Sequence, residues 1–278
     1  MAHPFQGARP GTMPFFEHFF YYPDARDRGS PAEARLDFED AAIRTADGVT
    51  LHGWYLPTPA RPARGTVLHL HGNAANISGH WPFVGWLPAA GYNVLTFDYR
   101  GFGRSGGKVT REGTILDAEA ALDYLRGRQD VAGQRVILFG QSIGATIAAV
   151  IASRRHGQVA AVVMDSAFTG YRDIAAHHIY RNPPMLLIAW WFPFGVSKTY
   201  DAIDHVPQIS PTPILFMHGT ADRIVPPVMS QRLYEAAKEP KEIWMVEGMD
   251  HMEVWEERGD LAARRFDEFV QATARGRT

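Results

Sequence analysis

Two serines of the chain, Ser105 and Ser142, stand at the centre of the pattern G-x-S-x-G. In this pattern a sharp turn between a strand and a helix exposes a serine hydroxyl as a nucleophile. Ser142 has both neighbours that the turn requires, since the apolar run 135–139 precedes it and the helical run 143–156 follows it. Ser105 is followed by Gly-Gly-Lys-Val-Thr, which is typical of a loop. We therefore predict that Ser142 is a nucleophile and that Ser105 is a turn residue.

A nucleophilic serine needs a base to take its proton and an acid to orient that base. When the serine lies on such a turn, the acid and then a histidine follow it along the chain. Asp222 lies just beyond an apolar run, 214–217, and His251 follows the last such run. The sequence therefore predicts Asp222 as the acid and His251 as the base. Asp165, at the end of an earlier run, is the alternative acid.

Attack on a carbonyl group creates a negatively charged oxygen, which backbone amides must stabilise. One donor is expected to be the amide of Ile143, which directly follows the nucleophile. The second is expected from Asn73, in the loop after the apolar run 66–70.

The elements that must position these residues alternate along the chain. An Asp-Gly pair at 47–48 joins two expected strands, 36–45 and 49–56, into a hairpin. Buried strands are then expected at 66–70, 92–97, 135–139, 159–164, 214–217 and 242–246, and helices at 78–90, 114–128, 143–156, 229–238 and 252–274. Such alternation predicts an α/β fold with a mostly parallel sheet, helices on both faces and the hairpin at one edge.

One segment, about 167–211, interrupts this alternation and is rich in aromatic residues. A loop of that length without structure is uncommon in a compact domain, so we expect a small helical cap. Its residues Trp190, Trp191 and Phe192 are candidates for lining a substrate pocket. The whole chain, 1–278, is expected to form a single domain. An aromatic N-terminal segment, 1–35, is expected to pack on its body.

Five motifs in order carry a resemblance to a known family: His71-Gly-Asn-Ala-Ala-Asn, Asp98-Tyr-Arg-Gly-Phe-Gly-Arg-Ser, Gly140-Gln-Ser-Ile-Gly, His218-Gly-Thr-Ala-Asp-Arg-Ile-Val-Pro and Gly248-Met-Asp-His. With them the chain resembles serine hydrolases of the α/β-hydrolase fold, closest to the bud-emergence-related and depalmitoylase-like branch. The resemblance implies the same triad, Ser142, Asp222 and His251, with oxyanion donors at Asn73 and Ile143.

Together these residues predict hydrolysis of carboxylic esters or thioesters through an acyl-enzyme intermediate. The same three residues can also support amidase, C–C hydrolase or perhydrolase chemistry, and a non-catalytic interaction module is the alternative outside the enzymes. Neither a cofactor nor a metal is expected. The adjacent histidines His177 and His178 lack the spaced carboxylates and histidines of a metal site. A dinucleotide-binding pattern, Gly-Phe-Gly-Arg-Ser-Gly at 101–106, lacks the helix that should directly follow it.

Composition restricts the partners. The 278 residues carry a net charge of −2 without charged blocks, so neither nucleic acid nor an anionic membrane is indicated. The chain has no cysteine, which excludes disulfides, a thiol nucleophile and S-acylation of the chain itself. No apolar stretch is long enough to span a membrane. We expect a cytoplasmic protein with a small-molecule or lipid-like acyl substrate, and the aromatic run 14–22 also allows peripheral membrane contact.

Overall fold

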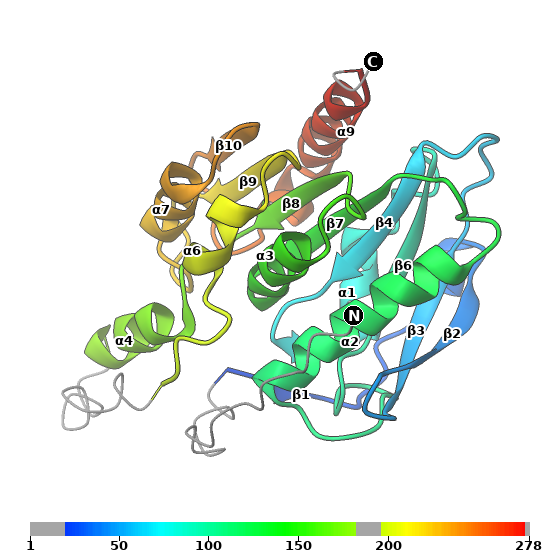
Figure 1. Cartoon of the computed structure of the whole chain (residues 1–278), viewed down its shortest axis with the longest axis horizontal. Helices are drawn as coiled ribbons and strands as arrows, with labels where there is room; N and C mark the ends of the chain where they lie inside the picture. Colours follow the sequence, from blue (N-terminus) through cyan, green and yellow to red (C-terminus); the bar gives the residue numbers. More distant parts are fainter. Residues whose placement is uncertain (1–19, 182–195, 276–278) are drawn as a thin grey trace, which may run out of the picture.

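The computed structural model describes residues 20–181 and 196–275 and has a single large sheet at its centre (Figure 1). Its strands lie in the order β10-β9-β8-β7-β4-β6-β3-β2. Their bounds are β2 (Glu39–Arg44), β3 (Thr50–Leu56), β4 (Gly65–Leu70), β6 (Tyr92–Phe97), β7 (Val136–Gln141), β8 (Ala161–Asp165), β9 (Ile214–Gly219) and β10 (Lys241–Val246).

The strands from β10 to β6 run parallel, whereas β3 is antiparallel to β6 and β2 to β3. The expected edge hairpin is therefore confirmed. Its turn contains Gly48, whose φ of 87° is open to glycine but rarely to other residues. Parallel strands need crossover connections, and these carry the helices to both faces of the sheet.

Side chains of successive residues in a strand point to opposite faces, so the sheet separates two hydrophobic clusters. Leu68 and Leu70 belong to one cluster, with α2 (Arg111–Gly127), α3 (Ile143–Arg154) and α7 (Pro227–Ala236). Val67 belongs to the other, with α1 (Ile77–His80), α8 (Val254–Glu257) and α9 (Gly259–Arg275). In Figure 1, α2 and α3 accordingly lie in front of the sheet, and α1 and α9 behind it.

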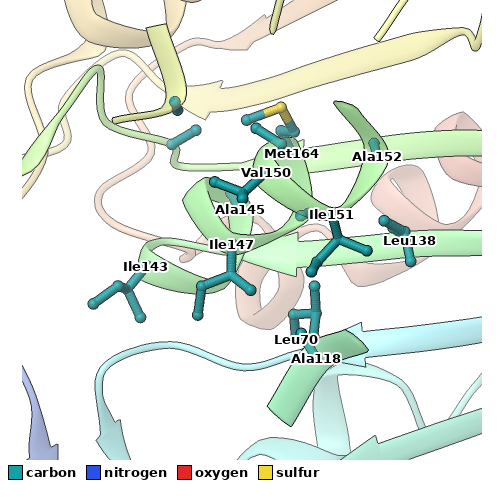
Figure 2. Close-up of a cluster of buried hydrophobic side chains, with 14 of the residues drawn as sticks. Leu70, Ala118, Leu138, Ile143, Ala145, Ile147, Val150, Ile151, Ala152 and Met164 are labelled. Atoms are coloured by element: carbon teal, nitrogen blue, oxygen red, sulfur yellow. The ribbon is translucent and has the colours of Figure 1, made fainter. Parts of the chain in front are cut away.

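Helix α3 is the most deeply buried of the described helices, since all its residues except Arg154 are buried. A helix that is apolar on all sides is typical of a protein interior. Figure 2 shows Ile147 and Ile151 on the side of α3 that faces Leu70 and Ala118, and Val150 beside Met164. Because α3 is packed on several sides, the turn at its N-terminus has a fixed position.

Two expected helices differ in length from the structure. The expected helix 78–90 is only α1, followed by the 3-10 turn Trp81–Phe83 and further turns, because Pro82 has no amide hydrogen to donate. The expected helix 252–274 is divided into α8 and α9 at Arg258, next to Gly259, which is a poor helix former.

The expected cap segment contains α4 (Tyr171–Arg181), α6 (Ala202–His205) and the 3-10 turn Val206–Gln208. The pocket candidates Trp190, Trp191 and Phe192 lie outside the described residues. Within 20–181 and 196–275, no helix combines the length and the apolar character needed to cross a membrane.

Candidate active site

Ser142 occupies the sharp turn between β7 and α3. Its φ of 54° and ψ of −115° lie in a region that residues with a side chain rarely adopt. The Ser142 amide donates a 2.8 Å hydrogen bond to the carbonyl oxygen of Asp165 at the end of β8. Such strain persists only where the surrounding structure holds it, and it is concentrated at functional sites. The turn has the geometry expected of a nucleophile elbow.

The glycines on either side of Ser142 allow this close approach of strand and helix. A Cβ atom at Gly140 would overlap the carbonyl oxygen of Gly144, and one at Gly144 would overlap that of Leu70. The second overlap involves the end of β4, which leads into the loop that carries Asn73.

Gly144→Ala is therefore expected to move α3 away from β4. Overpacking of this kind costs about 1–3 kcal/mol of unfolding free energy. A displacement of about 1 Å between catalytic groups can lower the rate about 10²-fold. Gly127→Ala is the control, because a Cβ there meets nothing within 4 Å. Thermal unfolding and ester turnover of both variants test this, and equal behaviour would contradict it.

Ser105 lies in a different environment. Its Oγ donates a 2.6 Å hydrogen bond to the carbonyl oxygen of Asp98 and accepts one of 2.9 Å from the His52 amide. Both bonds tie the loop to β3 and to the end of β6, as expected for a turn residue.

Asp222 and His251 are brought together by the loops after β9 and β10. His251 Nδ1 lies 2.7 Å from Asp222 Oδ2, and Asp222 Oδ1 accepts 2.8 Å hydrogen bonds from the amides of Ile224 and Val225. Burial alone would raise the pKa of Asp222, but hydrogen bonds from His218 and His251 hold it well below its usual value. The carboxylate is thus ionised and in position to fix the imidazole with its Nε2 free to accept a proton.

Asp165, the alternative acid, is engaged elsewhere. Its Oδ2 accepts hydrogen bonds from Gln141 Nε2 at 3.1 Å and from Trp255 Nε1 at 2.8 Å, and its Oδ1 accepts one from Ser166 Oγ at 3.0 Å. Burial raises the pKa of Asp165. None of the hydrogen bonds within the described ranges joins Asp165 to His251, so the geometry favours Asp222.

Ser142 opens on a cavity of about 470 Å³ that Asn73 and Ile143, the two expected oxyanion donors, also line. Among the described residues, no hydrogen bond joins Ser142 Oγ to His251. Catalytic hydrogen bonds are often long in proteins without substrate. The remaining lining is mostly apolar and comprises Phe20, Tyr22, Phe168, Ile174, Ala175, His178, Ile179, Ile224 and Val225.

Several of these lining residues were not identified from the sequence. The sequence indicates no role for His178 other than that of a metal ligand, and no group of three or more potential metal ligands occurs in the part of the chain that is described. Instead, His178 faces the cavity from α4, where burial and the nearby Arg181 lower its pKa. The aromatic run 14–22 was the only signal for Phe20 and Tyr22.

Comparisons with known proteins agree with this fold. The family of serine aminopeptidases S33 matches residues 61–198 and 191–258. The chain is 38% identical over 259 residues to the uncharacterized protein YfhR of Escherichia coli K12, covering 91% of this chain and 86% of YfhR. It is 31% identical to the alpha/beta hydrolase domain-containing protein WAV2 of Arabidopsis thaliana, and the match covers 88% of this chain and 82% of WAV2. It is 28% identical to protein bem46 of Schizosaccharomyces pombe, and the match covers 78% of this chain and 73% of bem46.

A solved structure, the esterase Pf2001 of Pyrococcus furiosus, superimposes with a TM-score of 0.74 at 27% identity, covering 90% of this chain and 98% of the esterase. Fold and relatives define an α/β hydrolase. The chain belongs to the serine aminopeptidase S33 family of these hydrolases and is related to bem46, which confirms the resemblance seen in its motifs.

Proposed function

We propose that the protein is a serine carboxylesterase or thioesterase that removes an apolar acyl group from a small-molecule or lipid-like substrate. The observation that carries the proposal is the His251–Asp222 pair at the carboxyl edge of the sheet. At the same edge, Ser142 lines a mostly apolar cavity. Clefts of this size and character bind apolar ligands, and the few polar groups in them fix the orientation.

The proposed reaction begins when Ser142 Oγ attacks the acyl carbonyl carbon and its proton passes to His251 Nε2. The amides of Ile143 and Asn73 stabilise the oxyanion. His251 then returns the proton to the departing alcohol or thiol, which leaves an ester of Ser142. A water molecule, deprotonated by His251, attacks this ester, and the protonated imidazole then returns the proton to Ser142 Oγ as the carboxylic acid is released. Asp222 remains ionised throughout and stabilises the protonated imidazole.

A substrate panel tests the proposal. We expect turnover of p-nitrophenyl esters and acyl thioesters, and much slower turnover of aminoacyl p-nitroanilides. Preferential cleavage of the anilides would show that the protein is an amidase and not an esterase. Inactivity on every acyl substrate would favour the non-catalytic module. The cytoplasmic location expected from the sequence is a separate proposal that cell fractionation tests.

The pH dependence of kcat/KM should reflect a histidine base. His251 can accept a proton only when neutral, so activity should rise as pH increases through the range in which histidines titrate, between about pH 5 and 8. Asp222 cannot cause this limb. Its pKa is held below the usual value of about 3.9, so the carboxylate stays ionised across that range. A rate that does not change between pH 5 and 8 would contradict the histidine base.

A further inference from the structure

The N-terminal segment 20–28 lies against the loop that carries the proposed oxyanion donor Asn73. The Tyr22 amide donates a 2.8 Å hydrogen bond to the Asn73 carbonyl oxygen, and β1 (Tyr22–Pro23) pairs in parallel with β5 (Ala74–Ala75). Asn76 Nδ2 donates to the carbonyl oxygens of Asp24 and Arg26, at 2.8 and 2.9 Å. The segment is thus held by hydrogen bonds to the Asn73 carbonyl group and to the Asn76 side chain.

Tyr21 anchors the same segment to the helices beside the cavity. Its side chain is 2% exposed, and its hydroxyl lies 3.2 Å from Thr114 Oγ1 of α2 and 3.0 Å from the Tyr171 hydroxyl of α4. The Phe20 ring packs edge-on against Tyr171 at 5.1 Å, and the Arg111 guanidinium lies over both rings. The segment therefore bridges α2, α4 and the loop after β4.

Tyr21 is not among the residues that line the cavity beside Ser142, whereas its two neighbours in the sequence are. Both line the cavity that contains Ser142. Phe20 is 7% exposed and forms an inner wall, whereas Tyr22 is 55% exposed and so stands at the rim. Across the cavity, α4 contributes Ile174, Ala175 and Ile179.

We infer that Phe20 and Tyr22 are specificity-determining residues of the active site, which contact the acyl group of the substrate and set the acyl length that the cavity accepts. The inference rests on the proposed function, since it assigns the cavity to the acyl group. Phe20 limits the depth of the cavity, and Tyr22 covers the outer part of a long chain.

The test compares kcat/KM for p-nitrophenyl octanoate and butyrate. Phe20→Ala deepens the cavity and should raise the octanoate-to-butyrate ratio about tenfold, because an added methylene that finds an apolar pocket is worth about 10-fold or more. Tyr22→Ala exposes the outer part of the chain to water and should lower the ratio. Since Tyr22 is largely exposed, this variant should fold even where Phe20→Ala does not.

Two control variants separate specificity from packing. Phe102 is fully buried and packs against Tyr21 without lining the cavity, so Phe102→Ala should lower the melting temperature and keep the ratio. Tyr180 is 62% exposed on α4 and does not line the cavity, so Tyr180→Ala should change neither the melting temperature nor the octanoate-to-butyrate ratio. Folded Phe20→Ala and Tyr22→Ala proteins with the parent ratio would overturn the inference.

Binding measurements keep this inference separate from the proposed function. In the Ser142→Ala background, calorimetric titration with the two uncleaved esters reports the cavity alone. If the parent protein hydrolyses no ester, the proposed function fails. Even if the proposed function fails, substitution of Phe20 or Tyr22 should shift the ratio of the dissociation constants of the octanoate and butyrate esters. An unchanged ratio overturns the inference.

Discussion

Ser142→Ala is expected to lower kcat for ester hydrolysis about 10⁶-fold, the size of effect known for removal of a nucleophilic serine in a triad. The variant keeps the backbone turn between β7 and α3 but has no oxygen to form the acyl-enzyme. Ser142 is 8% exposed. Its Oγ has no hydrogen-bond partner among the described residues, so the substitution breaks no hydrogen bond and the fold should tolerate it. Steady-state kinetics and a melting curve measure the two effects.

Ser105→Ala is the matched control, since Ser105 stands in the same G-x-S-x-G pattern. It loses the bonds to Asp98 and His52, which should cost about 1–3 kcal/mol of unfolding free energy because buried backbone groups lose partners. Its kcat should remain within a few-fold of the parent. A parent-like kcat in Ser142→Ala would rule out Ser142 as the nucleophile.

Asp222→Asn is expected to lower kcat about 10⁴-fold, because loss of the orienting carboxylate leaves the imidazole in the wrong tautomer. In the parent, Asp222 Oδ2 is 2.7 Å from His251 Nδ1 and accepts a hydrogen bond from it. An amide nitrogen at that position would donate to Nδ1 and place the hydrogen of neutral His251 on Nε2, where it cannot act as a base. Single-turnover kinetics on the pH plateau of the parent enzyme would measure the effect.

The corresponding variant of the other candidate acid, Asp165→Asn, should retain most of kcat. Asp165 accepts bonds from Gln141, Trp255 and Ser166, so the substitution should instead reduce stability. If Asp165→Asn proves the more damaging to kcat and Asp222→Asn the less, the orienting acid lies at the end of β8.

The parts of the site that lie next to strand ends could be predicted from the sequence. Ser142, Asp222 and His251 each follow an apolar run, and parallel strands bring such ends to one edge of a sheet. The edge hairpin was equally predictable, because its turn residues are local in the sequence.

The cavity wall could not be predicted in the same way. Phe20 is 151 positions from Tyr171 along the chain, and neither residue has a motif or a periodic pattern that indicates their contact. Likewise, His178 faces the cavity because of the way α4 is placed against the sheet, which is tertiary packing and not a local property. The proposed roles of Trp190, Trp191 and Phe192 stay predictions, since these residues lie outside the described ranges.

Covalent labelling tests the central claim most directly. A fluorophosphonate reacts with an activated serine and stays attached, and mass spectrometry of the digested protein locates the modified residue. We expect one modification, on the peptide that contains Ser142, and we expect it in Ser105→Ala but not in Ser142→Ala. Asp222→Asn should be labelled more slowly. A modification on Ser105, or no modification of a folded protein that hydrolyses esters, would contradict the assignment of Ser142 as the nucleophile.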